Sequence, residues 1–136
     1  MEFIKFSLSG FDDFLLYFLL SVVFVVAYLA IYVRVTPYRE FALIRAGNPA
    51  AAASLSGSLL GFVLPLASAV VHSVNVWDMA LWAAIALVVQ IAVYLAVRLT
   101  VPDMPRHIPE GKVGVGVFLG VVSLAAGLVN AACMTY

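Results

Sequence analysis

The sequence predicts an all-α membrane protein with four transmembrane helices, and three observations indicate this fold. The 136-residue chain is 65% hydrophobic and 10% charged, whereas soluble domains average about 45–50% apolar and 25% charged residues. Its seven basic and seven acidic residues leave four long charge-free runs. Each run is near or above the roughly 20 apolar helical residues that cross a bilayer. We therefore place the four spans at 13–34, 49–72, 78–99 and 113–135, within a single domain covering residues 1–136.

This composition excludes several classes of protein. A chain with so few charges cannot cover a soluble surface. This excludes soluble enzymes and nucleic-acid binders with a basic face, so we expect no nucleic-acid partner. The single cysteine, Cys133, excludes an internal disulfide. The first run is longer than the 7–15 apolar residues of a signal peptide and is flanked by Asp12 and Asp13, so we interpret it as a retained span.

The distribution of Lys and Arg predicts the orientation in the membrane. Only Lys5 precedes the first span, whereas the first and third connections together hold six basic residues. Because basic residues in short loops stay on the cytoplasmic side, we expect these two connections inside and both termini outside, in the periplasm. The candidates for contact with a cytoplasmic partner or anionic lipid are therefore Arg34, Arg39, Arg45, Arg98, Arg106 and Lys112.

The first connection is expected to contain a short amphipathic helix lying at the membrane interface. Thr36 can cap it, Pro37 suits its first position and Gly47 can end it. Asn48 then provides a second cap, before Pro49, for the second span. The third connection contains three prolines, which predict an irregular loop.

The chain also carries signs of an internal repeat. When the sequence is shifted by 64 residues, three distinctive pairs coincide at equivalent points: Arg34 with Arg98, Thr36 with Thr100 and Gly47 with Gly111. The two units would cover residues 9–72 and 73–136, each with two spans. Units with an even number of spans share one orientation, so we expect two parallel two-helix repeats related by an axis along the membrane normal.

Small residues recur at helical spacing in the second and fourth spans. Such stripes let helix backbones approach closely in lipid, and they are more often packing seams than conduction paths. The candidate helix-packing residues are Ala53, Gly57, Gly61, Gly116, Gly120, Ser123, Gly127 and Ala131.

A few polar features fall inside the spans. Pro65 cannot donate to the carbonyl of Gly61, so we expect a kink and a free acceptor there, satisfied by a neighbouring serine. Amides in lipid usually bind a partner helix, but they can also line a path for ions or solutes. The candidate polar residues within the membrane are Ser54, Ser58, Pro65, Gln90 and Asn130.

Catalytic and metal-binding patterns are weak. Ser68 and His72 lie four apart, but no carboxylate is placed in sequence to orient the imidazole. His107 and Cys133 complete no recognisable set of metal ligands. We therefore expect no enzyme activity and no cofactor.

Several stretches together resemble a known family. They are Thr36-Pro37 with Glu40 and Leu43-Ile44, Asn48 with Ala50 to Ala53, Leu60-Gly61 with Pro65-Leu66 and Ser68, then Gln90, Arg98 and the closing string Asn130-Ala131-Ala132-Cys133-Met134-Thr135. This pattern is similar to the YjfL family of small bacterial inner-membrane proteins, a domain-of-unknown-function family. The resemblance implies a four-span inner-membrane protein with a duplicated unit, in an envelope setting near membrane-stress proteins of the PspA type and polyamine-related ligases. It implies no catalytic residues.

Two functions follow as hypotheses. The first is an oligomeric structural or interaction protein of the cell envelope, packed through the small-residue stripes and presenting its basic connections to a cytoplasmic membrane-stress protein or to anionic lipid. The second is a channel or small-solute transporter with a polar path near Gly57 to Pro65. They are distinguished by whether Ser54, Ser58, Gln90 and Asn130 converge on one cavity or pair between helices.

Overall fold

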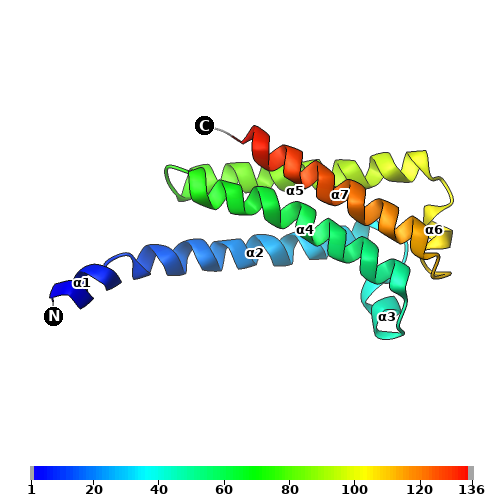
Figure 1. Cartoon of the computed structure of the whole chain (residues 1–136), viewed down its shortest axis with the longest axis horizontal. Helices are drawn as coiled ribbons and strands as arrows, with labels where there is room; N and C mark the ends of the chain where they lie inside the picture. Colours follow the sequence, from blue (N-terminus) through cyan, green and yellow to red (C-terminus); the bar gives the residue numbers. More distant parts are fainter. Residues whose placement is uncertain (1, 135–136) are drawn as a thin grey trace.

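The computed structural model describes residues 2–134, and every regular element in that range is an α-helix (Figure 1). The helices, in order, are α1 (Glu2–Leu8), α2 (Phe11–Val35), α3 (Glu40–Arg45), α4 (Pro49–His72), α5 (Val76–Thr100), α6 (Met104–His107) and α7 (Val113–Cys133).

Four helical stretches are long and apolar enough to cross a membrane, as the sequence predicts. Helices α2, α4, α5 and α7 match the expected spans to within about two residues at each end, the usual uncertainty of helix boundaries. The expected end of the last span, Thr135, lies outside the described residues. The short helix α1 was not expected, and it joins α2 through a turn at Ser9 and Gly10. Helix α6 was not expected either, because the third connection was predicted to be an irregular loop, and its prolines limit the helix to four residues.

The start of α4 follows the sequence prediction, but the start of α3 does not. Asn48 caps α4 because its side-chain oxygen accepts a hydrogen bond from the amide of Ala51 at 3.0 Å. The expected cap Thr36 instead ends α2, with an extended backbone at φ −75° and ψ 140°. A residue before proline disfavours the helical conformation, so Pro37 stays outside the helix and α3 begins only at Glu40.

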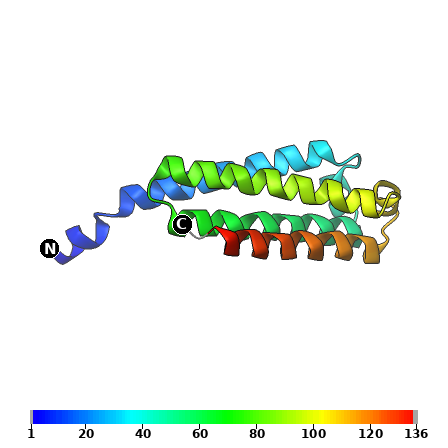
Figure 2. The ribbon, with the colours of Figure 1, turned by 90° about the horizontal axis from the view of Figure 1, so that it is seen from above.

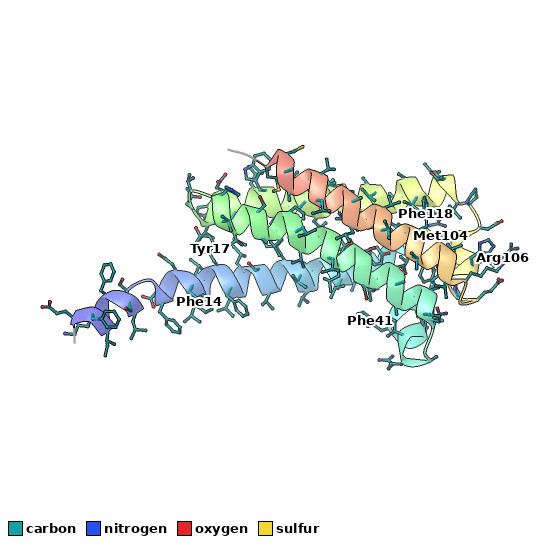
Figure 3. All side chains as sticks on the ribbon, in the orientation of Figure 1. Phe14, Tyr17, Phe41, Met104, Arg106 and Phe118 are labelled. Atoms are coloured by element: carbon teal, nitrogen blue, oxygen red, sulfur yellow. The ribbon has the colours of Figure 1, made fainter. Side chains whose placement is uncertain are left out.

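The helices form a bundle in which α4 and α7 lie side by side and run in the same direction (Figures 1 and 2). Helix α5 packs against both of them, and α2 contacts α4 and α5. Among the four spans α4 is the most buried and the first is the least. Helix α1 and the beginning of α2 project beyond the bundle, where Phe14 is 57% exposed (Figure 3).

Aromatic side chains fill the space between α2, α4 and α5. Tyr28 stacks on Phe62 with ring centroids 4.6 Å apart, and Tyr32 meets Tyr94 edge to face at 5.5 Å. All four side chains are at most 1% exposed. Aromatic pairs of this geometry add about 0.5–1.5 kcal/mol beyond the effect of burial, so they fix the C-terminal half of α2 to the bundle.

Candidate functional site

The contact between α4 and α7 is built by glycines. A Cβ added at Gly57 would overlap the backbone of Gly120, and one added at Gly127 would overlap the backbone of Gly61. If α4 and α7 moved apart to make room for a side chain, they would lose dispersion contacts with each other. No hydrophobic force would offset this loss, because lipid is as apolar as the helices. This contact therefore depends on the absence of side chains.

The other small residues singled out in the sequence lie along the same contact. Gly116 packs against the backbone of Ala50, and Gly120 against the carbonyl of Ala53. Towards the opposite end, the Ser68 hydroxyl donates to the carbonyl of Ala131 at 3.3 Å. The structure thus brings all eight candidate packing residues to a contact within one chain.

The side chain of Gln90 on α5 reaches the contact between α4 and α7 near Pro65. Its Nε2 donates to the carbonyl of Gly61 at 2.9 Å and to the carbonyl of Ser123 at 3.1 Å. The Gly61 carbonyl is the acceptor that Pro65 leaves without its usual helical partner. The expectation that a serine satisfies this carbonyl is wrong, because an amide from a third helix reaches it instead. Gln90 therefore ties α4, α5 and α7 together.

Ser58 forms a second polar junction, between α2, α4 and α7. Its hydroxyl lies 3.2 Å from the hydroxyl of Tyr32 and 3.4 Å from the hydroxyl of Ser123, and all three residues are at most 1% exposed. Hydroxyl groups buried in a bundle are stabilised only when they find such partners. Together with Gln90, this junction forms what we call the polar core: Tyr32, Ser58, Gln90 and Ser123.

The remaining polar candidates lie away from the polar core. The Ser54 hydroxyl donates to the carbonyl of Ala51 in its own helix at 3.1 Å. Asn130 lies in a shallow, mainly apolar depression on the outside of α5 and α7, together with Val89 and Cys133. The four side chains that could have converged on one cavity are therefore distributed over three separate places.

The residue that sequence reasoning missed is Glu40, which lies outside the spans but is only 1% exposed. The Thr36 hydroxyl donates to Glu40 Oε1, while Glu40 Oε2 is buried without a partner. Burial raises the pKa of the Glu40 carboxyl to about 7, although the hydrogen bond from Thr36 lowers it in part. A carboxyl in this range changes its charge near neutral pH.

A pattern in the connection could have revealed Glu40. Thr36, Tyr38 and Glu40 are buried, whereas Pro37 and Arg39 between them are exposed. This alternation is typical of an extended segment with one face against a core. The prediction of a helix capped by Thr36 hid it, because a helix starting at Pro37 would have turned Glu40 away from that face.

The basic candidates belong to the helix ends and connections at one end of the bundle, where α3 and α6 lie (Figure 1), and Figure 3 labels Arg106 there. We call this the basic end. Arg106 lies near Asp103 and Glu110 at 3.7 and 3.8 Å, and Lys112 lies 3.7 Å from Glu110. These pairs are solvent-exposed, so each contributes little to stability. The other basic residues there, apart from the half-buried Arg98, are also exposed, and they are Arg34, Arg39 and Arg45.

Asn48 joins the two connections of the basic end. Besides capping α4, its Nδ2 donates to the carbonyls of Ile108 and Pro109 at 3.0 and 3.2 Å. Gly47 and Gly111, which flank this junction, have φ of 84° and 78°, a conformation that favours glycine. The connection before α4 and the connection before α7 therefore hold each other in place.

Ser68 and His72 lie at the opposite end of the bundle. The Ser68 hydroxyl is 3.3 Å from His72 Nδ1, and the same nitrogen is 3.0 Å from the carbonyl oxygen of Ser68. Within residues 2–134, no three His, Cys, Asp or Glu side chains are grouped as they would be to hold a metal ion.

An apolar groove lies between α2 and α4. It has a volume of about 440 Å³ and an almost entirely apolar lining, which includes Phe18, Ser21, Val22, Leu66 and Val70. A groove of this kind fits an acyl chain or an apolar helix.

Comparisons with known proteins bear on the whole chain. A family model described as Domain of Unknown Function (DUF350) matches residues 6–134. The chain is 42% identical over 120 residues to the UPF0719 inner membrane protein YjfL of Escherichia coli strain K12 and to the protein of the same name in strain O157:H7. Each alignment covers 88% of this chain and 91% of the relative. No solved structure matches the chain.

Proposed function

The chain belongs to the DUF350 family of inner-membrane proteins, and from this premise we propose that it is an oligomeric structural or interaction protein of the cell envelope. The observation that carries the proposal is the use of the polar core. Tyr32, Ser58, Gln90 and Ser123 bind one another or the backbone of a neighbouring helix. Polar groups used in this way hold helices together.

We further propose that the bundle is a duplicated two-span unit. The helix positions support this, because α3 and α6 begin 64 residues apart, at Glu40 and Met104, as do α4 and α7, at Pro49 and Val113. The two glycines with positive φ, Gly47 and Gly111, are also 64 residues apart.

The oligomer contact is proposed on α2 rather than on the small-residue stripes. Those stripes are already occupied within one chain, which removes them from any contact between copies. Helix α2 instead exposes a row of aromatic residues, Phe11, Phe14 and Phe18, whose rings stack at 6.0 and 5.7 Å. This row borders the groove against α4, so a helix of a second copy could pack there.

Cross-linking between single cysteines tests this contact. In a Cys133→Ser background, Phe14→Cys on α2 is compared with Val88→Cys on the outer face of α5, which is 64% exposed. We expect oxidation in native membranes to give a dimer band for Phe14→Cys and none for Val88→Cys. Equal bands would reflect random collision and contradict a specific contact, and no band for either variant would contradict this interface.

The orientation and the interfacial position of α3 are also proposals. We propose that the basic end faces the cytoplasm, that α3 lies at the membrane interface, and that Arg39 and Arg45 contact anionic lipid or a cytoplasmic membrane-stress protein. The exposure of both residues supports this. The native Cys133 is exposed near the opposite end. A membrane-impermeant maleimide should label it from the periplasmic side in spheroplasts, and labelling only after lysis would reverse the orientation.

Transport is the competing function. A path beside Gly57 to Pro65 would need hydroxyl and amide groups open to water, whereas the polar core is buried, its hydroxyls bind each other, and the Gln90 amide donates to backbone carbonyls. Ion or solute flux in liposomes containing the purified protein, above that of empty vesicles, would overturn the structural proposal.

A further inference from the structure

Glu40 is enclosed by groups from several elements at the basic end. Thr36 and Tyr38 approach it along the connection, and Tyr32 of α2 and Tyr94 of α5 lie within electrostatic range. The hydroxyls of Tyr38 and Tyr94 are buried and interact with each other, whereas Glu40 Oε2 is buried without a hydrogen-bond partner. An unpartnered buried carboxyl oxygen is unusual, because buried polar groups nearly always find partners.

Few charges face this carboxyl. On α5 the half-buried Arg98 acts on Tyr94, but no ion pair of Glu40 exists among the residues that the structure describes. Helix α4 carries one ionisable side chain, His72, at its far end, and α7 carries only Cys133, also at the far end. A carboxylate here would thus be buried without a paired cation, which is strongly unfavourable.

The position of Glu40 connects its charge to the surface of the basic end. It is the first residue of α3, in the segment 36–48 that also carries the exposed Arg39 and Arg45. Asn48 ends this segment and binds the carbonyls of Ile108 and Pro109. Movement of Glu40 out of the core would therefore displace the basic side chains and pull on the second connection.

We propose that Glu40 is a proton-binding site that latches the segment 36–48 to the bundle. With a proton taken from water, the neutral carboxyl stays among Tyr32, Tyr38 and Tyr94, and the segment is docked. When the proton returns to water, the carboxylate needs hydration, and the segment opens so that water reaches it. The exposure of the basic connection then depends on pH.

The direction of the pH dependence follows from linkage. The carboxyl has a pKa of about 7 when docked and 4.5 as its ordinary value, so the docked state holds the proton more tightly. Docking is fully stabilised below the ordinary pKa and weakens as the pH rises to about 7, after which it levels off. The equilibrium constant for opening of the segment 36–48 should rise about tenfold for each pH unit in this range, and on the order of a hundredfold overall.

Amide hydrogen exchange of the full chain in lipid nanodiscs tests the latch. After correction for intrinsic exchange rates, we expect protection of the segment 36–48 to fall between about pH 5 and 7 and then to stay constant. Glu40→Gln should keep the segment protected at every pH, because the amide has the shape of the neutral acid and cannot ionise. As a matched control, Glu110→Gln removes an exposed carboxyl and should leave the profile unchanged.

A second variant separates the latch from a general loss of structure. Thr36→Val removes the hydroxyl that stabilises the ionised form, so it should move the transition to higher pH while the exchange of α4 and α7 stays unchanged. The proposal is overturned if Glu40→Gln keeps the pH dependence of the wild type, or if the wild-type segment shows no transition in this range.

Discussion

Gln90 and Pro65 act as one unit at the scale of single residues. Pro65 removes the amide that would normally bind the Gly61 carbonyl, and Gln90 replaces it from another helix. The sequence predicted the free carbonyl but not its partner, because the partner depends on how α5 packs across α4. A period of 3.6 residues indicates which residues share a face, but not which residue of a distant helix lies opposite.

We predict that Gln90→Leu destabilises the bundle by about 1 kcal/mol through the loss of its interhelical hydrogen bonds. In a Pro65→Ala background the cost should be smaller, since the restored amide can bind the Gly61 carbonyl within α4. Unfolding in mixed micelles of all four proteins gives the coupling. Strictly additive effects would show that the two residues act independently.

Gly127 is a position at which an added side chain is poorly tolerated. A Cβ there would overlap the Gly61 backbone, so we predict that Gly127→Ala separates α4 from α7 and costs on the order of 1–3 kcal/mol. The control is Gly114→Ala in the same helix, where nothing lies within 4 Å of the added carbon. That variant should be neutral or more stable, because alanine favours helix. Equal thermal unfolding of both variants would argue against this close contact.

At the scale of elements, the sequence predicted the four spans well, because length and charge distribution determine them almost alone. It was wrong about the start of α3 and did not predict α1 or α6. All three helices have seven residues or fewer, which is too short to give the long apolar run that identifies a span. For Glu40 the decisive property is its burial, among groups that include Tyr94, which is 54 positions away in the chain and lies within electrostatic range; no local pattern predicts this neighbour.

Asn48 is the residue through which two elements meet. We predict that Asn48→Ala costs about 1–2 kcal/mol by removing the α4 cap, and that it increases hydrogen exchange in both connections, at residues 46–52 and 104–112. The control is Asn75→Ala, at the opposite end of the bundle. Asn75 caps α5 because its side-chain oxygen accepts a hydrogen bond from the Asp78 amide at 2.8 Å. This variant should affect the start of α5 alone. Unchanged exchange at residues 104–112 in Asn48→Ala would show that the connections are not coupled.

At the scale of the whole molecule, the protein is a helical bundle that is held together by contacts in its interior. Glycines bring α4 and α7 together, the polar core joins them to α2 and α5, and the fourteen charged residues remain outside the span interiors. A chain built in this way has few groups left for chemistry within the membrane. Its interactions are expected at the basic end and along the outer face of α2.

Accessibility of the polar core to water tests this account most directly. In a Cys133→Ser background, Ser58→Cys and Ser123→Cys are exposed in membranes to a small water-soluble methanethiosulfonate, with Glu110→Cys as the exposed reference. We predict rapid modification at position 110 and none at positions 58 and 123, because a buried thiol meets no water and stays protonated. Modification at position 58 or 123 at a rate comparable to that at position 110 would contradict the account, since it would require a water-filled path through the bundle.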